Sequence, residues 1–106
     1  MEAALRAIAE PHRREILRLV WDAELPAGEI ARRFPVTRPA VSQHLRVLRE
    51  AGLVSERRQG TQRLYRARPE AIESLRAELD AFWGDGLARL KQAAEGDERR
   101  RRGRPA

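Results

Sequence analysis

The sequence of 106 residues lacks cysteine, which excludes disulfide bonds, thiolate metal sites and cysteine nucleophiles. It also lacks an apolar run of the roughly 20 residues that a membrane-spanning helix needs. The N-terminus has no signal-peptide pattern, because Glu2 and further charges interrupt its first turns. We therefore expect a soluble, cytoplasmic protein without a membrane partner.

The residue patterns of common enzymes are missing too. The sequence has no glycine-rich phosphate loop and no nucleophile placed beside a base. Its two histidines, His12 and His44, fall on different predicted helices, and we expect the first at the surface or in a dimer contact and the second packed and hydrogen-bonded. We expect no enzyme activity, no cofactor and no metal site.

Basic residues outnumber acidic residues by 22 to 16, and the formal net charge of +6 favours polyanionic partners. The excess is concentrated in residues 38–68, which contain eight arginines against two glutamates. Residues 1–37 are balanced, and residues 69–96 carry more acids than bases. A polyanion would therefore be attracted to the middle of the chain.

The middle of the chain begins with a predicted helix, residues 37–52, whose two ends are marked. Thr37 can accept a hydrogen bond from an orphan backbone N–H, and Pro39 falls in the first turn, where a missing N–H costs little. Gly52 can take the left-handed conformation that ends many helices. One face of this helix carries an apolar stripe at helical spacing, formed by Val41, Leu45 and Leu48.

The opposite face of this helix is polar and basic, and suits the major groove of DNA. Arginine can bind guanine through two hydrogen bonds, and glutamine can bind adenine in the same way. An ordinary solvated amphipathic helix remains the alternative for this stretch alone. The residues on this face are Arg38, Pro39, Ser42, Gln43, Arg46 and Arg49.

The segments before this helix predict a helix-turn-helix. Residues 2–9 form one helix, and a second runs from Pro11 to about Ala23. After a connection at residues 25–28, Glu29–Phe34 forms a short helix that a tight turn joins to Thr37. A short helix, a tight turn and a capped arginine-rich helix are typical of a DNA-binding helix-turn-helix.

The segments after the predicted helix at residues 37–52 predict a basic hairpin. Its strands are Leu53–Arg58 and Gln62–Arg68, and its tip is at Gly60. Directly after a recognition helix, such a hairpin is a wing that can reach phosphates or the minor groove. A solvated hairpin without function is the alternative. The basic residues near its tip are Arg57, Arg58 and Arg63.

A last helix is predicted from Pro69 to about Ala94, with one continuous apolar stripe. The compact wing domain is complete before this helix begins, so the stripe needs a partner, of which a second copy is the simplest. Packing wholly within its own chain is the alternative. Residues 95–106 are basic and lack apolar periodicity, so we expect a domain at residues 1–94 and a disordered tail.

This order of elements, mainly α with a small β-hairpin (α-α-α-α-β-β-α), resembles the ArsR/SmtB family of bacterial winged helix-turn-helix repressors. The resemblance lies in Leu5–Leu17 (LRAIAEPHRREIL), Ala27–Ala31 (AGEIA) and Pro39–Val54 (PAVSQHLRVLREAGLV). It implies a homodimer that represses transcription from a palindromic operator and pairs its first and last helices across the dimer. The implied interface residues here are Leu5, Ile8, Leu75, Leu79, Phe82, Trp83 and Leu87.

The chain departs from the family's metal sensors. Those proteins carry a cysteine pair on the short helix, where this chain has Ala31–Val36 without a thiol. Others use Asp and His on the terminal helix, where Leu75–Lys91 contains no histidine. The resemblance therefore implies the metal-independent branch of the family.

The predicted function is sequence-specific transcriptional regulation by a homodimer on double-stranded DNA. One alternative is a derepressor that binds an unidentified small molecule at the dimer interface, near Trp21, Phe82 and Trp83. Another is a winged-helix protein–protein adaptor. The predicted DNA-binding residues are Thr37, Arg38, Pro39, Ser42, Gln43, Arg46, Arg49, Arg57, Arg58 and Arg63.

Overall fold

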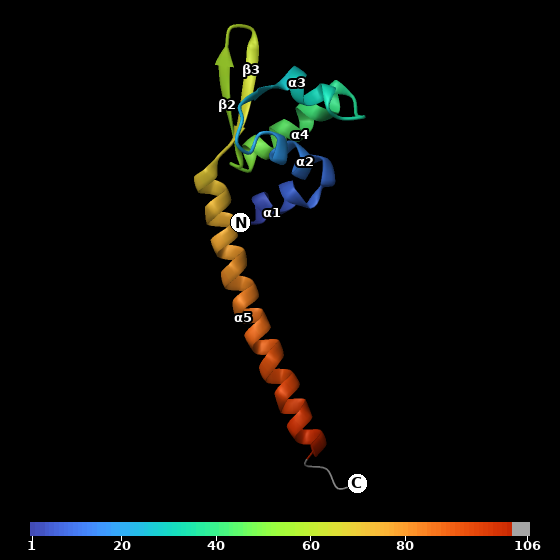
Figure 1. The fold of residues 1–106 in the computed structure, drawn as a ribbon, viewed down its shortest axis with the longest axis vertical. Helices are drawn as coiled ribbons and strands as arrows, with labels where there is room; N and C mark the ends of the chain where they lie inside the picture. The colour runs from blue at the N-terminus through green and yellow to red at the C-terminus, as the bar shows by residue number, and fades with distance from the viewer. Residues whose placement is uncertain (103–106) are drawn as a thin grey trace. The chain divides into compact units, whose positions relative to one another are not determined.

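The computed structural model describes the backbone of residues 1–102 and the side chains of residues 1–99. The chain forms two compact units, of which the first is Met1–Leu75 and the second begins at Arg76 within the last helix. Figure 1 labels the elements. In chain order they are α1 (Glu2–Ala9), α2 (Pro11–Leu19), β1 (Leu25–Pro26), α3 (Ala27–Arg32), α4 (Arg38–Glu50), β2 (Val54–Gln59), β3 (Gln62–Ala67) and α5 (Pro69–Arg102).

Helix α4 has the two ends that its sequence predicts. The Oγ1 atom of Thr37 accepts a hydrogen bond of 3.3 Å from the backbone N–H of Ala40. At the other end Gly52 has a φ of +78°, and its N–H donates to the carbonyl of Arg49 while that of Leu53 donates to the carbonyl of Leu48. This pair of bonds is a Schellman motif, which satisfies the last carbonyls of the helix.

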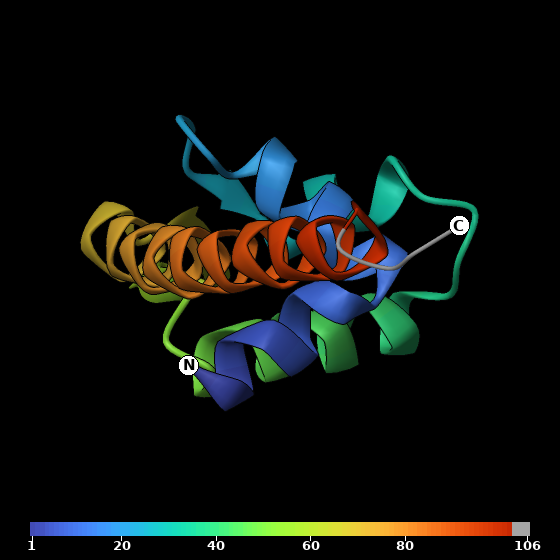
Figure 2. The same ribbon diagram turned by 90° about the horizontal axis from the view of Figure 1, so that it is seen from below.

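The core of the first unit forms around the apolar face of α4. Val41, Leu45 and Leu48 are at most 1% exposed. Helices α1, α2 and α3 all contact α4, and Figure 2 shows α1 lying alongside it. Helix α2 starts at Pro11 because Glu10 caps it, with its Oε2 atom accepting from the N–H of Arg13 at 2.9 Å. This packing fixes which face of α4 can meet a partner.

The sheet contains one strand more than the sequence predicted. Residues 25–28 were expected to be a connection, but Leu25 and Pro26 form β1, which pairs antiparallel with β3 in the order β1-β3-β2. A two-residue strand with a proline has no sequence pattern of its own, so only its pairing defines it. The hairpin is confirmed, with Gly60 at its tip having a φ of +62°, and α2, α3 and α4 gather on one side of it in Figure 1.

Two predicted helix ends are wrong, and the short helix is shifted. Helix α2 ends at Leu19, not near Ala23, because the carbonyl of Val20 accepts from Ala67 of β3 at 2.9 Å and so cannot continue a helix. Helix α3 lies two residues earlier than predicted, at Ala27–Arg32.

Helix α5 continues past Ala94 to Arg102. Residues 95–102 lack an apolar stripe, but glutamate and arginine are strong helix formers, and periodicity reports packing rather than helicity. The proposed division at residue 94 between domain and tail stays a prediction, and residues 103–106 lie outside the described part. Among the described residues, no helix has the length and apolar character needed to cross a membrane.

Candidate nucleic-acid interface

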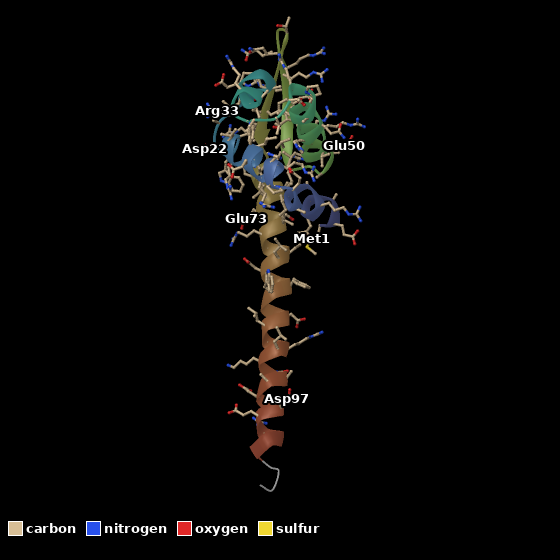
Figure 3. The ribbon with its side chains drawn as sticks, turned by 90° about the vertical axis from the view of Figure 1, so that its right-hand side faces the viewer. Met1, Asp22, Arg33, Glu50, Glu73 and Asp97 are labelled. Atoms are coloured by element: carbon tan, nitrogen blue, oxygen red, sulfur yellow. The ribbon has the colours of Figure 1, made fainter. Side chains whose placement is uncertain are left out.

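The outer face of α4 carries every DNA-binding residue that the sequence predicted for this helix, and all of them are exposed. Their exposure follows from the burial of Val41, Leu45 and Leu48 on the other face. Figure 3 shows nitrogen-tipped side chains around α3, α4 and the hairpin, with Arg33 and Glu50 labelled at the ends of the two helices. These predicted residues are Thr37, the N-cap, and Arg38, Pro39, Ser42, Gln43, Arg46 and Arg49 of α4.

The arginines of α4 have different partners. The Nε atom of Arg46 donates to Glu50 one turn later at 3.1 Å, an exposed pair that a base or phosphate can replace at little cost. Arg49 instead donates to Glu56 of β2 at 2.7 Å, and Glu56 also accepts from the hydroxyl of Tyr65 at 3.2 Å. Arg49 therefore ties the end of α4 to the base of the wing.

Arg38, at the start of α4, lies against Gly28 of α3. Its Nη2 atom is 3.3 Å from the position that a Cβ atom on Gly28 would occupy. A pocket of about 290 Å³ opens here, between α3, the start of α4 and the first residues of β3. Its guanidinium groups come from Arg32, Arg38 and Arg63, and Glu29 is its single acid. The lining of this pocket is thus a positively charged surface between the recognition helix and the wing.

The wing arginines divide between the two faces of the hairpin. Arg58 and Arg63 are directly opposite each other across β2 and β3, on the same face as Glu56 and Tyr65. Two like charges in a cross-strand pair repel each other, and an anion placed between them removes that repulsion. The Nε atom of Arg63 lies 3.7 Å from a carboxylate oxygen of Glu56. This face of the tip is therefore suited to a phosphate.

Arg57 lies on the other face, since successive strand residues alternate. Its guanidinium donates to both carboxylate oxygens of Glu24, at 3.1 and 2.5 Å. The hydrogen bond from Arg57 lowers the pKa of Glu24, and the same bond raises the pKa of Arg57. The sequence grouped Arg57 with Arg58 and Arg63, but in the structure Arg57 ties the wing to the segment before β1.

The residues predicted for the dimer interface differ in exposure. Leu75 is buried in the first unit, and Leu5, Ile8 and Leu79 are partly exposed. Phe82, Trp83 and Leu87 are 64, 58 and 57% exposed, and the rings of Phe82 and Trp83 meet edge to face at 5.9 Å between centroids. Trp21, which the sequence placed near the dimer interface, is 51% exposed and so is not in the core of this chain.

Sequence reasoning missed one cluster of polar side chains. Glu10, His12 and His44 lie together, although the chain separates the two histidines widely. His12 Nδ1 is 3.0 Å from Glu10 Oε1, and His44 Nδ1 is 3.4 Å from Nη1 of Arg13. Burial lowers the pKa of His44, and the charge of Arg13 lowers it further, against the opposing effect of Glu10. His44 is packed as predicted, but its contact with His12 depends on the tertiary fold.

Known proteins match the chain along most of its length. A family profile described as "Helix-turn-helix domain" matches residues 8–57. The "HTH-type transcriptional regulator Rv2034" of Mycobacterium tuberculosis is 43% identical over 99 residues, which cover 92% of each chain. The "Transcriptional repressor SdpR" of Bacillus subtilis is 38% identical over 60 residues, 57% of this chain and 67% of its own.

Solved structures give the same result. An ArsR-like transcriptional regulator from Rhodococcus sp. RHA1 superposes with a TM-score of 0.72 at 32% identity, covering 88% of this chain and 91% of its own. These similarities favour DNA binding over the adaptor alternative.

Proposed function

The chain belongs to the ArsR/SmtB family of DNA-binding transcriptional repressors, and on that premise we propose that it binds an inverted-repeat operator as a homodimer. This proposal rests on the side chains of the outer face of α4. A capped helix with its back buried in the core presents three arginines, a serine and a glutamine to solvent. That set matches the hydrogen-bonding groups on base edges in the major groove.

Base reading is assigned to the first turns of α4. Ser42, Gln43 and Arg46 reach base edges, and Arg38 bonds a base or a phosphate beside its pocket. Thr37 and Pro39 bring the start of the helix to the groove. On binding DNA, Arg46 gives up its hydrogen bond to Glu50 and donates to guanine instead.

Backbone contacts are assigned to the wing and its junction with α4. Arg58 and Arg63 hold a phosphate between them, which relieves their cross-strand repulsion. Arg49 acts mainly as a positioning residue through Glu56, whereas the pair with Glu24 holds the guanidinium of Arg57 away from DNA. The chain lacks the cysteine pair and the terminal-helix histidine of the family's metal sensors, so we infer that metals do not control it at those two positions.

Dimerisation is assigned to the helix pair α1 and α5. The exposed aromatic and leucine side chains of α5 form an apolar stripe of the kind that an isologous interface buries. Two copies of α4 then enter successive major grooves about 34 Å apart, in a cytoplasmic complex with DNA. A small molecule that binds near Trp21, Phe82 or Trp83 would be expected to quench tryptophan fluorescence and release the operator.

Selection of bound fragments from randomised duplex DNA, at near-physiological salt, tests this function. We expect an inverted repeat whose half-sites lie one helical turn apart. Recovery of no motif, with binding that disappears as salt rises, would contradict sequence-specific regulation and leave only unspecific attraction.

A further inference from the structure

The cluster of Glu10, His12 and His44 lies outside the DNA-binding face of α4 and joins two elements. Glu10 and His12 come from the start of α2, and His44 comes from the middle of α4. One ligand atom from each residue lies within 4.8 Å of the others, and all three side chains are partly buried. Thus three groups able to bind a cation meet at the junction between α2 and the recognition helix.

The donor set is that of a transition-metal site. Two imidazoles and one carboxylate are the protein ligands that Zn²⁺ and Co²⁺ take in three-ligand sites, with water completing the coordination. His44 Nδ1 and Glu10 Oε2 are 3.8 Å apart, close to the span of about 3.4 Å between two ligands of one tetrahedral zinc ion. A small side-chain adjustment therefore brings these atoms to one ion.

The contacts of His44 show that its Nδ1 atom directs a lone pair, and not a proton, into the cluster. Arginine can only donate hydrogen bonds, so the approach of Arg13 Nη1 at 3.4 Å makes Nδ1 of His44 the acceptor and places the ring proton on Nε2. The unprotonated Nδ1 thus lies near a carboxylate oxygen with no proton between them. Glu10 Oε2 also accepts from Arg13 N–H, but a carboxylate oxygen has a second lone pair for an ion.

Arg13 is the group that opposes a cation here. Its Nε and Nη2 atoms donate to the carbonyls of Ala7 and Arg6 at 2.6 and 3.1 Å, which anchors the guanidinium on α1. Its Nη1 atom uses the single lone pair of His44 Nδ1, so an ion binds there only after Arg13 has moved away, and the positive charge weakens metal binding further.

We propose that Glu10, His12 and His44 form a site for one divalent transition-metal ion per chain, which links α2 to α4. This site differs from both metal positions of the family, which lie on the short helix and on the terminal helix. Any effect of the ion on operator affinity rests on the proposed function, whereas metal binding does not. The test therefore reads metal binding directly.

The chain favours a clean experiment, because it has two histidines and no cysteine. Zinc chloride is titrated into the tag-free protein, with calorimetry for stoichiometry and nitrogen-15 NMR of the imidazoles for the ligands. We expect one zinc per chain and simultaneous shifts of both imidazoles. His44→Gln and His12→Gln should each weaken binding by more than about tenfold, since even second-shell changes cost 10–100-fold. The control is Glu15→Gln, because Glu15 also lies on α2 but its carboxylate pairs with Arg18.

Circular dichroism of each variant checks the fold, and Arg13→Gln supplies an independent readout. Removal of the opposing charge should tighten zinc binding. The proposal is contradicted if the two imidazoles respond at separate zinc concentrations, if both folded histidine variants bind as the parent does, or if Arg13→Gln binds no more tightly.

Discussion

Helices α4 and α5 share the same apolar spacing, but their stripes have different surroundings. In α4 the stripe of Val41, Leu45 and Leu48 is at most 1% exposed, and the polar face is left for a partner. In α5 the side chains of Phe82 and Trp83 are more than half exposed. The same apolar periodicity therefore occurs in α4, which packs against the core of the first unit, and in α5, whose aromatic side chains face water. The first is suited to DNA and the second to another chain.

Substitutions on the exposed stripe of α5 should change assembly strongly. Phe82→Gln with Trp83→Gln removes two aromatic anchors, each worth about 2 kcal/mol or more at an interface, so the dimer dissociation constant should rise at least about a hundredfold. Sedimentation velocity measures this change. Ala81→Gln, an exposed position on the opposite face of α5, is the control and should remain dimeric. An unchanged dissociation constant in the double variant would refute the assignment of this stripe.

The matching change in α4 should affect folding rather than assembly. Leu45→Ala leaves a cavity in the core and should lower the free energy of unfolding by about 2–5 kcal/mol, as measured by urea denaturation. Ser42→Ala, on the exposed face of the same helix, should stay within about 0.5 kcal/mol of the parent. Equal losses in the two variants would mean that α4 has no preferred buried face.

Arg46→Ala should change sequence preference more than stability. Loss of a bidentate contact with guanine removes about 1–3 kcal/mol of discrimination at one base pair. Binding titrations on the operator and on duplexes altered at single positions measure the change. A uniform loss of affinity with the preference retained would show that Arg46 contacts only the backbone.

Arg58→Ala should weaken binding to all sequences alike. The loss of one phosphate contact lowers the slope of log affinity against log salt by about 0.9. Titration of one duplex at several salt concentrations gives this slope. A selective loss at one base pair would instead indicate base reading by the wing.

Glu24→Gln should have the smallest effect and the opposite sign. It releases Arg57 from a bidentate pair, so the guanidinium can move toward DNA and unspecific affinity should rise slightly. The same salt titration measures this change. Weaker binding in this variant would show that the pair with Glu24 positions the wing for DNA.

Local sequence signals predicted α4 closely, because its cap at Thr37 and its terminal Gly52 act within one turn of the chain. The sequence could not predict β1, since a two-residue strand exists only through its pairing with β3. The candidate DNA-binding site likewise has features that local sequence predicts and features that it does not. Exposure of Arg46 follows from helical spacing, whereas the pairing of Arg57 with Glu24 depends on distant segments that only the tertiary fold brings together.

Operator affinity, measured on a full inverted repeat and on a single half-site, tests whether α5 joins two recognition helices in one dimer. We expect the parent to bind the full site about 10² to 10⁴ times more tightly than the half-site, because the second contact is then intramolecular. The variant with Phe82→Gln and Trp83→Gln should bind both duplexes alike, at the half-site affinity of the parent. If that variant kept its preference for the full site, α5 would not be the element that joins the two recognition helices.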